Sequence, residues 1–214
     1  MFVGARLTFH QPLRMGVPAI RDGTIRDVTL KSGRSGALAF VTVAYRYTQN
    51  DVLCLEEEQD IVYREAGLTV AAPVVRDAFL PSLSSGGASC TVTPDPRLLF
   101  RFSALTFNAH RIQYDRDYAR SSEGYPGLVV HGPLTAMLLL RPAEQQTTRP
   151  IERFSFRGIR PLFDLAPFRL VAQTNTHSVS LEAHAPDHAV AVTAIASLGN
   201  VTANSIAALP TLSA

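Results

Sequence analysis

The chain has 214 residues, of which 46% are hydrophobic and 18% charged, so it can bury a substantial core and is too apolar to be disordered. Twenty Lys and Arg residues against eighteen Asp and Glu residues give a formal charge of +2, and no basic cluster stands out, which argues against a nucleic-acid partner. No apolar run approaches the roughly 18 residues of a transmembrane helix, and Arg6 and His10 interrupt the region where a signal peptide would be apolar, so we expect a cytoplasmic protein without a membrane partner.

Four β-type segments occupy the first part of the chain. They are rich in β-branched and aromatic residues and comprise residues 5–14, 19–31, 38–48 and 52–65. The breaks at 15–18, 32–36 and 49–51 contain Gly, Pro or Asn, which favour turns. The pattern predicts four antiparallel strands joined by hairpins.

Two features of the sequence raise the question of a metal site. The carboxylates of Glu56, Glu57 and Glu58 are adjacent, but neighbouring side chains of a strand point to opposite faces, so we interpret the run as a solvated edge strand. Cys54 and Cys90 have neither a CxxC spacing nor a Cys/His ligand spacing. We therefore predict no metal site and no disulfide framework.

The second part of the chain follows a segment rich in Pro, Ser and Gly, which we interpret as a linker. Thr93 to Pro96 resembles an N-cap followed by a first helical turn and predicts a helix over 95–106, and Pro133 begins a second, apolar helix that we expect to end near Pro142. Strand patterns then cover 151–160, 168–176, 178–185 and 188–198. The predicted units are an N-terminal unit at 1–70, a linker at 71–92, a C-terminal unit at 93–199 and a tail at 200–214.

Four sequence segments carry a family resemblance: RLTFHQPL at 6–13, EEQDIVYRE at 57–65, FSALTFNAHRI at 102–112 and YPGLVVHGPL at 125–134. They resemble the acyl-thioester hydratases and dehydratases of the MaoC, or hydratase 2, group, and especially the branch of 3-methylfumaryl-CoA (mesaconyl-C4-CoA) hydratases and 3-hydroxyacyl-thioester dehydratases. The resemblance implies an α+β double hot dog, in which an antiparallel sheet wraps a central helix twice, and a homodimer.

The first half departs from that pattern. No helix-length periodic segment precedes its four strands, so we expect an N-terminal half hot dog that lacks its central helix. A missing helix would leave a groove over the sheet, and the resemblance implies that such a groove receives a bulky acyl group.

The resemblance also points to catalytic positions. The family pattern S-G-D-x-N-P-x-H places an Asp and a His five residues apart, and this chain has Asn108 and Gln113 at those two places. A carboxamide cannot take up a proton at neutral pH, so ordinary general-base hydration is in question. Either His110 replaces the base, or the nucleophile is an amine that needs none. A structural role for His110, and a scaffolding role for the two amides, are the alternatives.

The segment LVVHGPL matches the entrance to the family's central helix. The resemblance implies that Gly132 donates its backbone N–H to the thioester carbonyl at a helix N-terminus, where developing enolate charge is stabilised. Substrate contacts are expected from Phe107, Arg111, Tyr125, Val130 and His131. We expect His131 to support the loop rather than transfer protons, and Arg111 to meet CoA phosphate, with solvated surface as the alternative.

Taken together, these residues predict a lyase that adds to, or eliminates from, the Cα=Cβ bond of an enoyl thioester. The alternatives are addition of an amine such as an amino acid, with or without thioester hydrolysis, and a non-catalytic acyl-thioester-binding partner. No separate cofactor is expected, because CoA or the phosphopantetheine of an acyl carrier protein is part of the substrate.

Overall fold

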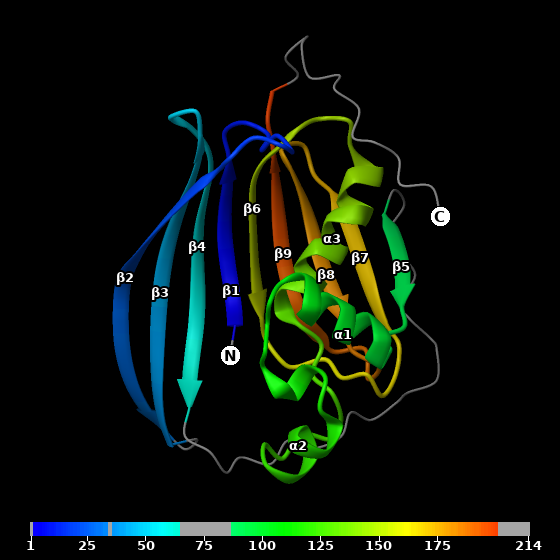
Figure 1. The fold of residues 1–214 in the computed structure, drawn as a ribbon. Helices are drawn as coiled ribbons and strands as arrows, with labels where there is room; N and C mark the ends of the chain where they lie inside the picture. Colours follow the sequence, from blue (N-terminus) through cyan, green and yellow to red (C-terminus); the bar gives the residue numbers. More distant parts are fainter. Residues whose placement is uncertain (1, 34–35, 65–86, 201–214) are drawn as a thin grey trace.

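A computed structural model describes residues 2–33, 36–64 and 87–200. Their strands form one antiparallel sheet in the order β2-β3-β4-β1-β6-β9-β8-β7-β5 (Figure 1). The strands are β1 (Phe2–Phe9), β2 (Ile20–Gly33), β3 (Gly36–Gln49), β4 (Val52–Arg64), β5 (Ala88–Val92), β6 (Ile151–Gly158), β7 (Phe168–Thr174), β8 (Ser178–His184) and β9 (Val190–Leu198). The helices are α1 (Pro96–Leu105), α2 (Arg116–Ser121) and α3 (Gly132–Gln146), and a 3-10 turn covers Arg111–Gln113.

The pairing of β1 with β6 joins the two halves into one sheet. The register runs from Gly4 opposite Arg157 to Thr8 opposite Arg153. The backbones approach closely at one end of this junction, because a Cβ built on Gly4 would lie 2.7 Å from the carbonyl oxygen of Phe156. Glycine at position 4 is therefore a steric requirement of the junction.

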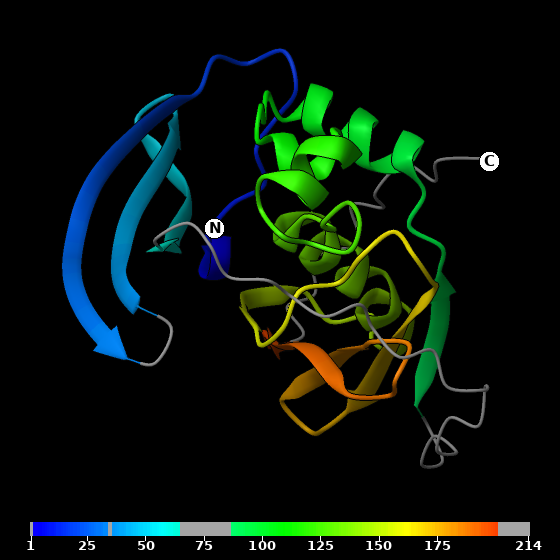
Figure 2. The ribbon, with the colours of Figure 1, turned by 90° about the horizontal axis from the view of Figure 1, so that it is seen from below.

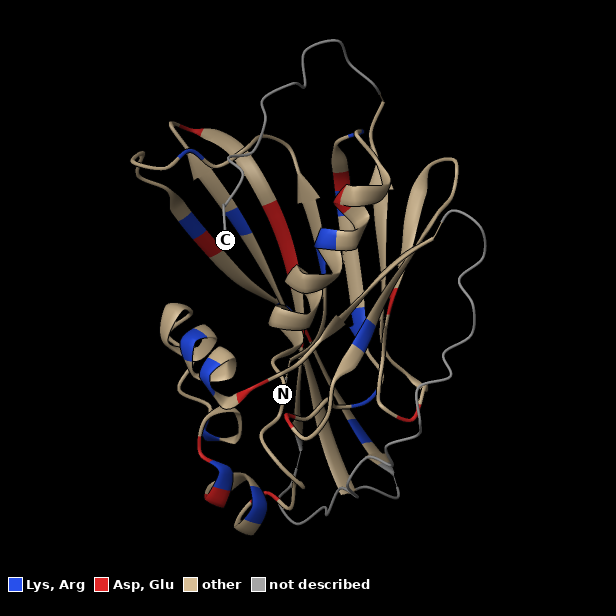
Figure 3. Ribbon diagram, turned by 90° about the vertical axis from the view of Figure 1, so that its right-hand side faces the viewer, with Lys and Arg blue, Asp and Glu red and all other residues tan. Residues whose placement is uncertain are grey.

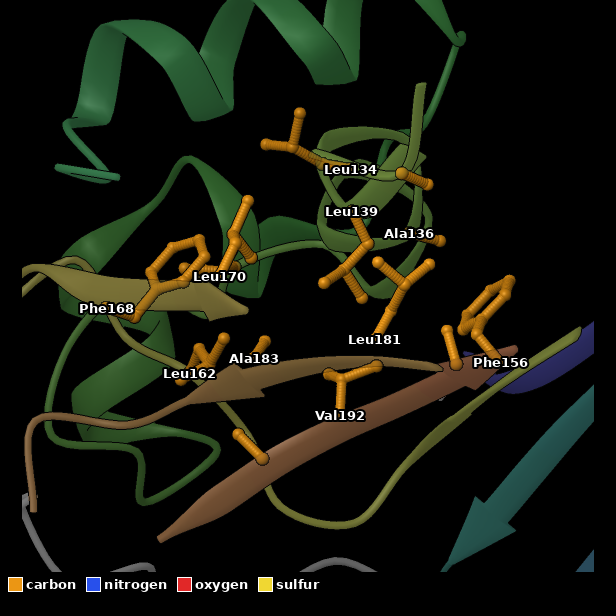
Figure 4. Close-up of a cluster of buried hydrophobic side chains, with 14 of the residues drawn as sticks. Leu134, Ala136, Leu139, Phe156, Leu162, Phe168, Leu170, Leu181, Ala183 and Val192 are labelled. Carbon is orange, nitrogen blue, oxygen red and sulfur yellow. The ribbon is translucent and has the colours of Figure 1, made fainter. Parts of the chain in front are cut away.

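The core lies between α3 and the sheet of the second half. Leu139 of α3 and Leu170, Leu181 and Ala183 of the facing strands are each at most 1% exposed. Figure 4 shows Leu139 of the helix pointing toward Leu170 and Leu181 of the strands. This helix on an antiparallel sheet is the arrangement that the family resemblance implies for the second half.

The first half carries no comparable helix. Among the described residues no helix precedes β5, and Figure 2 shows the helices gathered over the second half while β2 and β3 curve away. Ile25, Val28 and Leu30 of β2 are 65%, 57% and 78% exposed. The described part of this half thus fits the expected half hot dog.

One face of the first half carries ion pairs between β1 and β4. Arg6 of β1 donates to Glu58 at 2.9 Å and to Asp60 at 2.6 Å, both on β4. The hydrogen bond from Arg6 holds the pKa of Asp60 below its ordinary value. Elsewhere, Lys and Arg segments are scattered over helices and strands, with Asp and Glu segments between them (Figure 3).

Both predicted helices are present, with one correction. Asp95 caps α1 by accepting the N–H of Leu98 at 2.8 Å, as the sequence predicts. α3 does not end near Pro142 but continues to Gln146. Pro142 costs the helix one backbone hydrogen bond, yet Pro142 and Ala143 are buried, and we attribute the continuation to this packing.

Long-range pairing corrects three expectations for the strands. β1 pairs with β4 and β6, so its connection to β2 is not a hairpin. β4 lies between β3 and β1, so Glu56–Glu58 are not on an edge strand. The end of the predicted linker forms β5, which pairs with β7. The predicted hairpins β2–β3 and β3–β4 do form, and the latter turns through Asn50 and Asp51, both at positive φ.

Parts of two predicted segments, 71–86 of the linker and 201–214 of the tail, lie outside the described residues. Within the described part of the chain, no helix is long and apolar enough to cross a membrane. The same residues contain no group of three or more His, Cys, Asp or Glu side chains that could hold a metal ion.

We expect Gly4→Ala to destabilise the protein by about 1–3 kcal/mol, because the added methyl group would overlap a backbone oxygen that cannot move without disturbing the β1–β6 pairing. Urea unfolding measures the change. Gly158→Ala is the matched control on β6, since its Cβ would lie 3.4 Å from the carbonyl oxygen of Val3. Equal stability of the wild type and Gly4→Ala would contradict a close-packed junction.

Candidate active site

A cavity of about 340 Å³ lies where the two halves meet. Its walls come from β1, β4, the first turn of α3, the segment that follows α1, and the connection between β6 and β7. The residues that line it include Phe2, Ile61, Asn108, His110, Gln113, Val130, Gly132, Thr135 and Arg160. Both halves of the sheet are therefore needed to form it.

A reversal of the chain after α1 carries the polar side chains to this cavity. Phe107 adopts φ +52°, and the N–H of Asn108 donates to the carbonyl of Ser103 at 2.8 Å. A left-handed residue at this place ends a helix and turns the chain. The Phe107 side chain is 95% exposed and does not line the cavity.

Asn108 and Gln113 form a hydrogen-bonded amide pair. The 3-10 turn at 111–113 brings Gln113 back, so that Nδ2 of Asn108 donates to Oε1 of Gln113 at 2.6 Å. Oδ1 of Asn108 accepts the backbone N–H of His110 at 3.0 Å. The spacing of five residues thus places both amides at one wall of the cavity, where they can orient a bound molecule but cannot accept its proton.

His110 is the titratable side chain of this wall. It lines the cavity beside the amide pair. Partial desolvation of the imidazole lowers its pKa below the ordinary value of 6.5. The side chain is therefore neutral at pH 7 and has a free electron pair for accepting a proton.

The first turn of α3 supplies the backbone donor. Gly132 is the first residue of the helix, and its N–H has no acceptor inside the helix. A Cβ at position 132 would lie 3.5 Å from a side-chain atom and from the backbone oxygen of Phe2. The helix N-terminus therefore opens onto the cavity next to β1.

His131, which precedes Gly132, packs against α1. It is fully buried, its Nε2 lies 2.8 Å from Oγ of Ser103 on α1, and its ring meets that of Phe102 edge-on at 4.8 Å. Burial lowers its pKa to about 4. A neutral ring leaves the positive end of the helix dipole without a competing cation.

Asp164 fixes the loop that leads into α3. Its buried carboxylate accepts the N–H of Leu128 at 2.8 Å and pairs with Arg116 of α2. A Cβ on Gly127 would lie 2.7 Å from Oδ1 of Asp164, so the loop packs directly on the carboxylate. The N–H of Val130 donates to the carbonyl of Leu162 at 2.8 Å, which joins this loop to the β6–β7 connection.

The structure brings together five of the nine residues predicted from sequence. Asn108, His110, Gln113, Val130 and Gly132 line the cavity. The other four lie elsewhere: His131 is buried and Phe107 is exposed.

Tyr125 and Arg111 are held by other partners. Tyr125 is 4% exposed and packs in a separate cluster with Ile112 and Phe163. The guanidinium of Arg111 pairs with Asp115 at 2.6 Å and lies 4.1 Å from the centre of the Tyr118 ring. Neither side chain lines the cavity.

Sequence reasoning missed Arg160, which lines the cavity from the β6–β7 connection. Nothing in the sequence distinguishes it from the other arginines. It also missed Asp164, whose role depends on contacts between segments far apart in the chain.

Comparison with known proteins identifies the family of the chain. The family model described as hydroxyacyl-thioester dehydratase type 2 matches residues 1–164. The chain is 61% identical over 199 residues to the mesaconyl-C(4)-CoA hydratase of Chloroflexus aurantiacus, covering 93% of this chain and 70% of that protein.

Two solved structures from Mycobacterium tuberculosis share the fold. HtdX superposes with a TM-score of 0.72 at 16% identity, covering 92% of this chain and 76% of that chain. A conserved protein described as having a double hot dog fold superposes with a TM-score of 0.58 at 14% identity, covering 92% and 74%. The fold is thus the double hot dog.

We expect His131 to make the protein less stable as the pH falls. Its pKa is about 4 when folded and near 6.5 when unfolded, so the unfolded state binds more protons below pH 6.5. The loss should approach about 3 kcal/mol near pH 4 and should be absent above pH 7. Urea unfolding between pH 4 and 7 measures it.

His131→Asn, which keeps a polar N-cap, should reduce this pH dependence, whereas substitution of the exposed His177 by Gln should not. An unchanged pH dependence in His131→Asn would contradict the assignment.

Proposed function

The chain belongs to the hydroxyacyl-thioester dehydratase type 2 family, and we propose that it adds water to, or eliminates water from, the Cα=Cβ bond of an enoyl-CoA thioester. One observation carries the proposal: an imidazole, an amide pair and the N-terminus of α3 line one cavity. The name of the Chloroflexus relative supports CoA as the thiol. An acyl carrier protein that presents the same phosphopantetheine arm is the alternative donor.

The thioester carbonyl is held at the start of α3. Its oxygen accepts the N–H of Gly132, and the helix dipole stabilises the negative charge that develops there. This contact polarises the conjugated double bond and makes Cβ electrophilic. The apolar side chains of Phe2, Ile61 and Val130 surround the acyl group, and a volume of about 340 Å³ suits a short acyl chain.

His110 acts as the general base. As the water oxygen bonds to Cβ, one water proton passes to the imidazole and the π electrons move through Cα to the thioester oxygen, giving an enolate. Collapse of the enolate takes a proton at Cα, which the imidazolium returns. The lowered pKa of His110 keeps the ring unprotonated at neutral pH and so ready for the first step.

The amide pair positions the water. In the pair, Oε1 of Gln113 accepts from Asn108, which leaves the Gln113 NH₂ group to donate toward the cavity. An NH₂ group donates to the water oxygen and so holds its lone pair toward Cβ. The amides therefore contribute orientation, and His110 contributes the proton transfer.

A second candidate, addition of an amine to the same enoyl thioester, is favoured by the amide pair itself. A neutral amine attacks Cβ through its own lone pair and loses its extra proton afterwards, so it needs no base at position 113. Amide groups suit the orientation of an amine as well as of water.

Removal of the imidazole tests the base. We expect His110→Gln to lower kcat for hydration of 3-methylfumaryl-CoA about 10²- to 10⁴-fold with little change in KM, because general-base catalysis contributes on this scale. The assay follows loss of the enoyl absorbance. His177→Gln is the control for an exposed histidine. Full activity in His110→Gln would exclude His110 as the base.

Restoring an imidazole at position 113 tests the amide pair. We expect Gln113→His to raise kcat and to rescue His110→Gln in the double variant, since a second base then faces the same water. Products should be scored by mass with and without a panel of amino acids. An adduct that forms only with an amine would support the second candidate, and saturable binding without any product would contradict both and indicate a binding protein.

We further propose that the protein is a homodimer, as the family resemblance implies. β2 is an edge strand, and the exposed Ile25, Val28 and Leu30 lie on it. An edge of this kind is normally covered. Light scattering should give twice the 23.2 kDa mass of one chain, and Val28→Lys should shift the mass toward the monomer. A monomeric wild type would contradict the proposal.

A further inference from the structure

The polar groups of the proposed mechanism come from two separate segments of the chain. Gly132 begins α3, whereas Asn108, His110 and Gln113 lie in the segment that follows α1. The proposed reaction needs the thioester carbonyl at Gly132 and the nucleophile at the amide pair to be held at a fixed separation. A contact that joins the two segments would set this separation.

Ser103 contacts both segments. It lies on α1, is 5% exposed and does not line the cavity. Its backbone carbonyl accepts the N–H of Asn108 at 2.8 Å, and its Oγ lies 2.8 Å from Nε2 of His131, the residue before Gly132. One buried residue is thus bonded to the start of α3 through its side chain and to the amide segment through its backbone.

The backbone contact belongs to the C-terminal cap of α1. Besides the bond from Asn108 to Ser103, the N–H of Phe107 donates to the carbonyl of Ala104 at 3.3 Å, and Phe107 has φ +52°. These two bonds around a left-handed residue form a Schellman motif, a common helix cap of defined geometry. The motif therefore fixes the position of Asn108 relative to Ser103.

The side-chain contact has a direction. The pKa of His131 is lowered by burial to about 4, so its ring is neutral at pH 7 and carries one N–H. Nδ1 of the ring is buried and has no hydrogen-bond partner among the residues that the structure describes. Because an unpaired buried N–H is rarer than an unpaired buried acceptor, we assign the proton to Nε2, which then donates to Oγ of Ser103. Removal of the Ser103 hydroxyl would deprive this N–H of its acceptor.

We propose that Ser103 is a positioning residue, which holds the N–H of Gly132 at the separation from the amide pair that the reaction needs. Ser103 acts through His131, whose carbonyl accepts the N–H of Thr135 at 3.0 Å in the first turn of α3, so a shift of His131 moves the start of the helix. The inference rests on the proposed function and gives a role in it to a residue outside the cavity.

Infrared spectroscopy of a bound thioester tests the position of the Gly132 N–H. Butyryl-CoA with heavy carbon at its carbonyl is saturated, so it binds without hydration. The hydrogen bond from Gly132 should lower the carbonyl stretching frequency of the bound molecule below that of the free molecule. We expect Ser103→Ala to lose part of this shift. Ser121→Ala, the matched control, removes an exposed hydroxyl that donates to the carbonyl of Asp117 on α2 and should keep the whole shift.

Hydration of 3-methylfumaryl-CoA gives a second readout. We expect Ser103→Ala to lower kcat about 10-fold, the scale of one net hydrogen bond, and to change KM by less than about threefold. Urea unfolding of the same variants corrects kcat for any loss of folded protein. In the background of His131→Leu, which removes both ring nitrogens, Ser103→Ala should lower kcat no further, because the two residues act as one unit.

Three results would overturn the proposal. A full carbonyl shift and an unchanged kcat in a less stable Ser103→Ala would show that Ser103 supports only the fold. An equal loss of kcat with and without the His131 ring would show that Ser103 acts independently of His131. A wild type without any carbonyl shift would instead contradict the Gly132 contact of the proposed function, and this inference with it.

Discussion

The pairing of β1 with β6 is the constraint on which the rest of the molecule depends. It makes one sheet of two halves and requires glycine at position 4, where a Cβ would overlap the carbonyl oxygen of Phe156. Because β1 also contacts α3, the first residues of the chain reach the helix that opens onto the cavity. The first half has no described helix of its own over β2–β4, yet Phe2 and Ile61 from that half complete a cavity whose polar groups come from the second. A single β-pairing therefore couples folding of the chain to formation of the site.

The family pattern has a carboxylate and a histidine at two positions. In this chain, orientation of the nucleophile and proton transfer are assigned to different residues. Asn108 and Gln113 occupy the two positions and hydrogen-bond to each other, so orientation remains while proton transfer is lost from position 113. His110 lies beside them on the same wall, and the buried, neutral His131 leaves the start of α3 free for a developing negative charge. The same cavity also contains the guanidinium of Arg160, which donates to Asp187.

The sequence could predict features that depend on residues close together in the chain, but not features that depend on contacts between distant segments. Local signals sufficed for α1, where Asp95 and Pro96 define a cap, and for the turn at Asn50 and Asp51. Partners of β1 and the inclusion of β5 in the sheet depend on pairing between distant segments, which no local pattern encodes. Family motifs located Asn108, Gln113 and Gly132 because spacing fixes their backbone positions. The same motifs could not show that Tyr125 packs elsewhere, that Phe107 takes a left-handed conformation, or that Arg160 lines the cavity.

In the proposed reaction water is the nucleophile although no histidine occupies position 113. Incubation of the wild type with 3-methylfumaryl-CoA in heavy-oxygen water, followed by mass analysis of the product, tests this most directly. We expect a product that carries one heavy oxygen at Cβ. A product without heavy oxygen, formed only when an amine is supplied, would contradict it.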